Sequence, residues 1–135
     1  MLTISVDQRN AMVATCIRAL PNEGCGLLVG TAEGQVHDVM ASANVADSAR
    51  VYEIDPGVVL RASRRADALG LEIIGVFHSH THSAAVPSAT DVAQAPDPDW
   101  HYVLISLVPV PAEVKSYRIV MGEVAPELLD VTDGE

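Results

Sequence analysis

The fold is decided by residues 72–91, which read EIIGVFHSHTHSAAVPSATD. The first seven of these residues, ending at His78, form a nearly continuous apolar run. Such a run is typical of a central strand that is covered on both faces of a sheet. Residues 79–87 show no periodicity and are expected to be irregular. Ser88 and Asp91 then have the spacing of a capping box, which predicts that a short helix begins here.

Hydrophobic periodicity and turn residues predict the other elements. Asp7 is a suitable N-cap for a first helix, and Pro21 ends it. Asp55 with Pro56 predicts the start of a second helix, and Gly70 its end. The apolar face of the first helix is expected to contain Met12, Val13, Cys16, Ile17 and Leu20. Strands are expected at 2–6, 26–30, 36–41, 51–54, 72–78, 101–107, 113–121 and 123–131, and the short helix at 88–95.

These elements fit one α/β domain over residues 1–135, with a mixed sheet flanked by helices. Residues 132–135 are expected to be a frayed tail. The chain is 49% hydrophobic and 19% charged, as in a folded globular protein. Cys16 and Cys25 are too few for a disulfide framework, and Cys16 fits a core position on the first helix.

The net charge of -10, from eight basic and eighteen acidic residues, disfavours nucleic acid as a partner. Arg61, Arg64 and Arg65 form the only close basic group, and we interpret them as the solvated face of a surface helix. The sequence shows neither a signal-peptide pattern nor an apolar run long enough to span a bilayer. No membrane is expected as a partner, and the expected compartment is the cytoplasm. The sequence does not indicate an oligomeric state.

His78 and His80 are the residues that first indicate chemistry. Alternation along an extended backbone places both imidazoles on the same side, which suits a single zinc ion. Asp91, in the first turn of the next helix, is close enough to be a third ligand. Two histidines and one carboxylate leave the fourth position to water, as in catalytic zinc sites. We therefore expect one zinc ion per chain. Such a water becomes a nucleophile at neutral pH.

A zinc hydrolase also needs a general base and a donor for the developing oxyanion. Glu23, in the loop before the glycine-bounded strand, is the best candidate for the base, and Ser88 suits the second role. Structural interpretations remain open for the individual residues. A histidine on a strand is often structural, and Ser88 with Asp91 can be a capping box and nothing more. These interpretations do not explain why two histidines end a buried strand beside that cap.

Glu23 followed by His78-Ser79-His80, seven residues, Ser88, two residues and Asp91 resembles the motif of the JAMM (MPN+) metallopeptidase family. The segment 21–30 and the strand 101–106 are also similar to that family, and the resemblance extends from about Leu2 to Val131. It is closest to the small bacterial Mec-type members. The resemblance implies a curved mixed sheet flanked by helices, similar to the fold of cytidine deaminases.

The resemblance also implies roles. His78, His80 and Asp91 would bind zinc, Glu23 would be the general acid/base, and Ser88 would stabilise the tetrahedral intermediate. Mec-type members release an amino acid or a short extension from the C-terminal Gly-Gly of a ubiquitin-like sulfur-carrier protein. That carrier would therefore be the partner, and cysteine biosynthesis is one pathway that this activity serves.

Several residues fall outside these roles. Thr81 follows the second histidine, where many eukaryotic members have proline. We interpret His82 as a surface residue or a substrate contact and not as a ligand, and Cys25 as packing behind Glu23. His37 and His101 have no predicted partner.

The sequence disfavours two other functions. A binding module without activity, as in relatives that keep the fold and lose the motif, is disfavoured because every motif position is present. A zinc deaminase acting on a small molecule is disfavoured because such enzymes carry His-x-Glu with a Cys-x-x-Cys pair, and this chain has neither.

Overall fold

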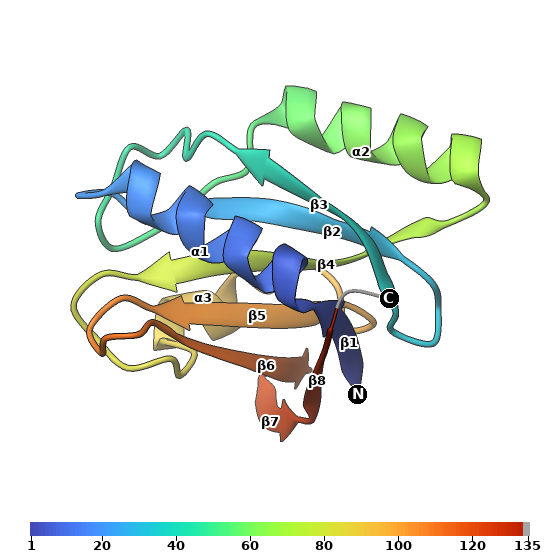
Figure 1. Ribbon diagram of the computed structural model, residues 1–135. Coiled ribbons are helices and arrows are strands. Elements are labelled where there is room, and N and C mark those ends of the chain that lie inside the picture. The colour runs from blue at the N-terminus through green and yellow to red at the C-terminus, as the bar shows by residue number, and fades with distance from the viewer. Residues whose placement is uncertain (134–135) are drawn as a thin grey trace.

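The computed structural model describes residues 1–133 (Figure 1). Within them the chain forms three helices and eight strands. The helices are α1 (Val6–Ala19), α2 (Pro56–Leu69) and α3 (Ala89–Ala93). The strands are β1 (Leu2–Ser5), β2 (Cys25–Gly30), β3 (Val36–Ser42), β4 (Glu72–His80), β5 (His101–Ser106), β6 (Glu113–Val120), β7 (Glu123–Glu127) and β8 (Leu129–Thr132). None of the helices in this part of the chain has the length and hydropathy that a membrane crossing requires.

The main sheet has the strand order β3-β2-β4-β5-β6-β7. β4 and β5 are parallel and are joined by a crossover that contains α3, whereas the other neighbours are antiparallel. The predicted mixed sheet is therefore confirmed. β4 lies between β2 and β5, and this explains its apolar sequence, because a central strand is covered on both faces. β1 and β8 form a separate parallel pair.

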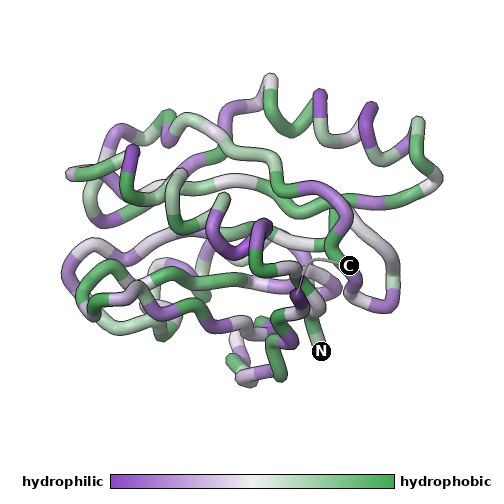
Figure 2. The backbone as a smooth tube through the Cα atoms, viewed as in Figure 1, coloured by the Kyte–Doolittle hydropathy of each residue, from purple (hydrophilic) through white to green (hydrophobic). Residues whose placement is uncertain are grey.

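α1 covers one face of the sheet and α2 covers the other, so the core is divided into two layers. Alternation along each strand assigns successive side chains to different layers. Figure 1 shows α1 lying across the front of the sheet, and in Figure 2 the tube of α2 alternates between polar and apolar residues. The first layer contains Met12 and Cys16 of α1 with Leu28, Phe77, Val103 and Ile105 of the sheet. The second contains Val58, Ala62 and Ala66 of α2 with Leu27, Val29, Val76 and Leu104.

The start of α1 differs from the prediction. Ser5, not Asp7, is the N-cap, because its hydroxyl accepts a hydrogen bond from the amide of Gln8 at 3.0 Å. The side chain of Gln8 accepts in return from the amide of Ser5 at 2.9 Å, which completes a capping box. The apolar face is also narrower than predicted, since Ile17 and Leu20 are 53% and 48% exposed. Only the side of the helix that carries Met12 and Cys16 faces the sheet.

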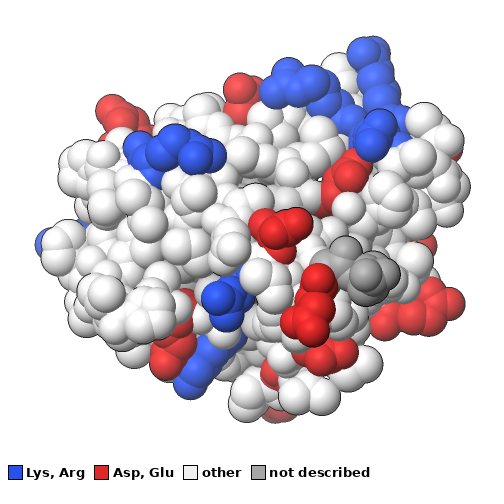
Figure 3. Space-filling model, viewed as in Figure 1, with Lys and Arg blue, Asp and Glu red and all other residues white. Residues whose placement is uncertain are grey.

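The predicted boundaries of α2 are confirmed. Asp55 caps the helix by accepting from the amide of Gly57 at 2.9 Å, and Gly70 ends it in the left-handed conformation. The three arginines predicted to be solvated are exposed on this helix. Figure 3 shows basic side chains gathered over α2 at the upper right.

Three strand predictions need correction. Residues 51–54 form only one isolated bridge, between Asn44 and Ile54, because the Asn44 side chain bonds to the backbone here instead of a neighbouring strand. Residues 123–131 form two strands, since the chain leaves β6 after β7 and pairs with β1 as β8. Thr132 belongs to β8 and is not frayed, whereas residues 134–135 lie outside the described residues. β4 continues through His80, two residues beyond its predicted end.

The capping box of α1 gives a test. Replacing Ser5 with Ala should lower the free energy of unfolding by about 1 kcal/mol, because the amide of Gln8 loses its acceptor. Asp7→Ala should cost only about 0.3 kcal/mol, since it removes a charge near the helix dipole and no cap. Urea titration of both variants measures the difference. Equal losses would contradict Ser5 as the cap.

Candidate metal centre

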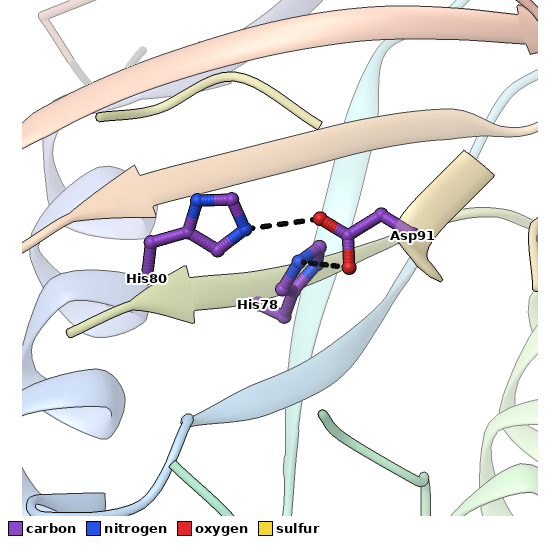
Figure 4. A group of neighbouring side chains, drawn as sticks. All are labelled: His78, His80 and Asp91. Carbon is purple, nitrogen blue, oxygen red and sulfur yellow. Dashed lines mark hydrogen bonds and ion pairs between the residues drawn. The ribbon is translucent and has the colours of Figure 1, made fainter. Parts of the chain in front are cut away.

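Three potential metal ligands converge at the end of β4. His78 and His80 lie two residues apart on this strand, on the same face, and are 3% and 5% exposed. Asp91 reaches them from α3, as Figure 4 shows. Its Oδ2 lies 3.0 Å from Nε2 of His80, and its Oδ1 lies 3.2 Å from Nε2 of His78. The two ring nitrogens and a carboxylate oxygen all lie within 4.8 Å of one another.

The position of Asp91 follows from the local structure of α3. Ser88 is the N-cap, and its hydroxyl accepts from the amide of Asp91 at 3.1 Å. The amide of Ser88 donates to Oδ2 of Asp91 at 2.9 Å, and that same oxygen faces His80. The capping box therefore exists as predicted, and it orients the carboxylate toward the two imidazoles. The capping interpretation and the ligand interpretation describe the same side chain and do not exclude each other.

The imidazole rings are held in orientations that suit metal binding. Nδ1 of His80 lies 2.8 Å from the carbonyl oxygen of Ala84 and donates to it, which fixes the ring so that Nε2 faces Asp91. His78 stacks on Tyr52 with ring centroids 4.3 Å apart. Nothing in the sequence marks Tyr52 as part of the site, because its loop meets β4 only in the tertiary structure.

The electrostatics of the cluster favour an anionic Asp91 beside His78 in its neutral form. Burial lowers the pKa of His78, which keeps this ring neutral. The hydrogen bond to Asp91 raises the pKa of His80. Burial opposes ionisation of Asp91, but His78 and His80 outweigh it and hold the pKa of this carboxyl far below its usual range. Asp91 and His78 are therefore in the forms that bind zinc, and zinc binding at His80 would release the proton that Asp91 stabilises on this ring.

The donor set fits a zinc ion. Nε2 of His78 is buried without a hydrogen-bond partner among the described residues, since Asp91 lies within reach but outside hydrogen-bond geometry. A buried ring nitrogen with no partner needs an explanation, and a metal ion would provide one.

Glu23 is brought to this cluster by strand register. In the β2–β4 pair, Cys25 lies opposite His78. Beyond the end of β2, the amide of Gly24 donates to Oγ of Ser79 at 2.8 Å, and the amide of Ser79 donates to the carbonyl of Gly24 at 3.0 Å. The same register therefore places Glu23 opposite His80, on the face that carries the ligands.

Glu23 has the environment expected of a general base. It is 3% exposed, and its Oε1 has no hydrogen-bond partner within residues 1–133. Burial raises the pKa of its carboxyl to about 7 against a smaller opposing effect of His80. Glu23, His80 and Ser88 face one cavity of about 270 Å³. The hydroxyl oxygen of Ser88 accepts a hydrogen bond from the amide of Asp91, so the hydroxyl proton remains available to donate into this cavity.

The two cysteines and the remaining histidines of the described chain are not part of the ligand cluster. Cys16 and Cys25 are fully buried, and burial raises the pKa of their thiols to about 12 and about 11, which suits core residues and not nucleophiles. His82 is exposed at the cavity rim. His101 has a partner that the sequence did not indicate: its Nδ1 lies 2.6 Å from Glu127, because β7 folds back beside β6.

Fold and site together define an α/β protein with a candidate metal centre, and comparison with known proteins gives the family. The family described as prokaryotic homologs of the JAB domain matches residues 5–120. The chain belongs to this family.

Individual relatives agree with this assignment. The CysO-cysteine peptidase of Mycobacterium tuberculosis is 40% identical over 138 residues, which cover 98% of this chain and 92% of the relative. The solution structure of a Desulfitobacterium hafniense protein is similar to this chain with a TM-score of 0.90 and 35% identity. The match covers 100% of this chain and 94% of the Desulfitobacterium hafniense chain. A JAB1/MPN domain protein from Archaeoglobus fulgidus, at 17% identity, shares the fold with a TM-score of 0.62 and coverage of 98% and 99%.

The ligand set can be tested by metal binding. Asp91→Asn keeps an oxygen that accepts from the amide of Ser88 but removes the negative charge. Zinc affinity should fall by more than about 10- to 100-fold, which is the typical loss when a residue that only hydrogen-bonds a metal ligand is replaced. His82→Ala removes a neighbouring imidazole outside the cluster and should leave zinc affinity unchanged. Competition titration with a chromophoric chelator measures both. Equal affinities for the two variants would remove Asp91 from the ligand set.

Glu23 should make the stability of metal-free protein fall as pH rises. Its pKa is about 7 in the folded protein against an ordinary value of 4.5, so between these values the folded state holds a proton that the unfolded state has released. The stabilisation is complete below the ordinary pKa and is lost as pH rises through the folded one. Glu23→Gln should therefore gain about 2 kcal/mol relative to wild type between about pH 5 and about pH 8.

Urea titrations at the two pH values measure this change. Glu33→Gln, at an exposed glutamate in the turn before β3, is the matched control and should show no such gain. A pH-independent difference between wild type and Glu23→Gln would refute the assigned environment of this carboxyl.

Proposed function

We propose that this protein is a zinc peptidase that hydrolyses the bond after the C-terminal Gly-Gly of a ubiquitin-like sulfur carrier, releasing an amino acid such as cysteine or a short extension. One observation carries the proposal: Glu23, His80 and Ser88 face one cavity beside a three-ligand metal cluster. A base, a metal ligand and a hydroxyl donor at one cavity are the parts that amide hydrolysis requires. The relative named CysO-cysteine peptidase supports the substrate class.

The residues of this chain have distinct roles in the proposed reaction. His78, His80 and Asp91 would hold the zinc ion, which supplies Lewis acidity and lowers the pKa of water. Glu23 accepts a proton from the attacking water while the oxygen of that water bonds to the scissile carbonyl carbon. Ser88 donates to the oxygen of that carbonyl as negative charge develops there. Glu23 then gives the proton to the leaving nitrogen as the carbon–nitrogen bond breaks.

The environment of Glu23 suits both proton transfers. A general acid/base works best when its pKa is near the pH of the reaction, and burial raises the pKa of Glu23 to about 7. Its backbone is fixed, since its amide donates to the carbonyl of Ser48 at 2.8 Å and its carbonyl accepts from Asn44 at 3.0 Å. The carboxylate is therefore held at the cavity without a hydrogen bond that would compete for the proton.

The size of the cavity favours an extended tail as substrate. About 270 Å³ between loops 49–50 and 81–83 admits a few residues of extended chain and not a folded domain. The C-terminal tail of a ubiquitin-like carrier meets this requirement, because it extends from the folded part of that protein. The alternative of a catalytically inactive binding scaffold predicts no need for an aligned base and three aligned ligands.

Glu23→Gln tests the proposal. The variant should bind close to one zinc per chain, since Glu23 is outside the ligand cluster, and should lose about 100- to 10,000-fold in turnover of a Gly-Gly-Cys-terminated sulfur carrier. Mass spectrometry of the products and metal analysis of the same samples provide the two measurements. Glu33→Gln should match the wild type in both.

Two results would contradict the proposal. Wild-type turnover by Glu23→Gln would exclude Glu23 as the base. Purified wild-type protein with zinc far below one per chain, and without cleavage after zinc is added, would instead favour the binding scaffold.

A further inference from the structure

The cavity at the metal centre has a basic residue that the proposed chemistry does not use. Arg50 lies on its wall together with Glu23, His80 and Ser88. It is exposed, and it is the only lysine or arginine that borders this cavity in the described part of the chain. None of the catalytic steps assigned above needs a fixed positive charge at this position.

The backbone of Arg50 is tied to the backbone of Glu23. The hydroxyl of Ser48 accepts from the amide of Arg50 at 3.0 Å and from that of Val51 at 3.3 Å, which forms a tight turn. The carbonyl of the same Ser48 accepts from the amide of Glu23 at 2.8 Å. Asn44 also donates to the carbonyl oxygens of Ser48 and Glu23, at 3.2 and 3.0 Å. The turn that presents Arg50 therefore keeps a defined position relative to the base.

The guanidinium group is available for a ligand. Among the described residues it has no ion pair or side-chain hydrogen bond, whereas Arg65 pairs with Asp38 at 2.6 Å and Arg118 donates to the carbonyl of Asp99 at 3.3 Å. The chain has a net charge of -10, so an anionic substrate is repelled by the protein as a whole. A local cation at the cavity is what an anionic group would need in order to bind there.

We propose that Arg50 binds the α-carboxylate of the residue that is released, an inference that rests on the proposed function. When one residue follows Gly-Gly, its carboxyl carbon lies about 2.5 Å from the scissile nitrogen, across one Cα atom. A wall residue of the cavity that contains Glu23 is therefore placed to reach it. Guanidinium binds carboxylate through two parallel hydrogen bonds, which gives orientation as well as affinity.

This subsite makes the protein selective for a type of linkage. A carrier extended by one residue presents a carboxylate next to the scissile bond. An isopeptide conjugate presents the hydrocarbon stem of a lysine side chain there and leaves Arg50 without a partner. Arg50 thus selects a short linear extension over a protein conjugate, and the released product is a free amino acid.

The test compares two substrates with zinc-loaded, full-length protein. Both are a ubiquitin-like sulfur carrier ending in Gly-Gly and extended by one alanine, which carries either a free carboxylate or a carboxamide. Wild type should cleave the carboxylate form with a kcat/KM about 10- to 100-fold higher, as expected for a hydrogen-bonded charge pair. Arg50→Gln should abolish this preference, and Arg50→Lys should retain part of it because the charge remains.

Arg9→Gln is the matched control, because it changes the net charge by the same amount as Arg50→Gln. Arg9 is exposed on α1 and does not line the cavity that contains Glu23. It should keep the full preference. Equal cleavage of the two substrates by wild type, or a preference that survives Arg50→Gln, would overturn the carboxylate subsite alone. Cleavage of neither substrate by wild type would overturn the proposed function, and the subsite with it.

Discussion

The antiparallel register between β2 and β4 is the constraint on which the site depends. It places Cys25 opposite His78, and by continuation Glu23 opposite His80. A slip of one residue would turn Glu23 into the apolar layer beneath α1. Close packing makes that slip unfavourable, because a methyl group added at Gly24 would lie 2.6 Å from the Cα atom of Cys16. Backbone hydrogen bonding and the fit of α1 against β2 therefore position the candidate base.

This arrangement buries polar atoms without hydrogen-bond partners at the candidate metal centre. Oε1 of Glu23 and Nε2 of His78 are buried without hydrogen-bond partners in the described chain, and such atoms lower stability. The two apolar layers on either side of the sheet offset this cost. Groups held at a cost to stability are a common property of functional sites. The same burial that makes Glu23 unfavourable in the ionised state raises its pKa toward neutrality, where a proton acceptor and donor is useful.

Sequence patterns succeeded where the signal is local. The apolar run before His78 predicted the central strand, and the spacing of Ser88 and Asp91 predicted the cap of α3. They failed where distant pairing decides. Residues 123–131 alternate well enough for one strand, but the chain turns away at Leu128 because β8 finds its partner in β1. The pairing of a strand is a property of two segments, and one segment does not contain it.

By itself, the sequence determined which three side chains come together at the candidate metal centre. His78 and His80 share a face because they are two residues apart on a strand, and the capping box turns Asp91 toward them over a short distance along the chain. Only the tertiary structure decided that Glu23 and Arg50 meet His80 at one cavity. Their placement depends on strand register and on a turn bonded through Ser48, which are contacts between segments far apart in sequence. Such contacts form only when the two core layers pack, and no short-range pattern encodes them.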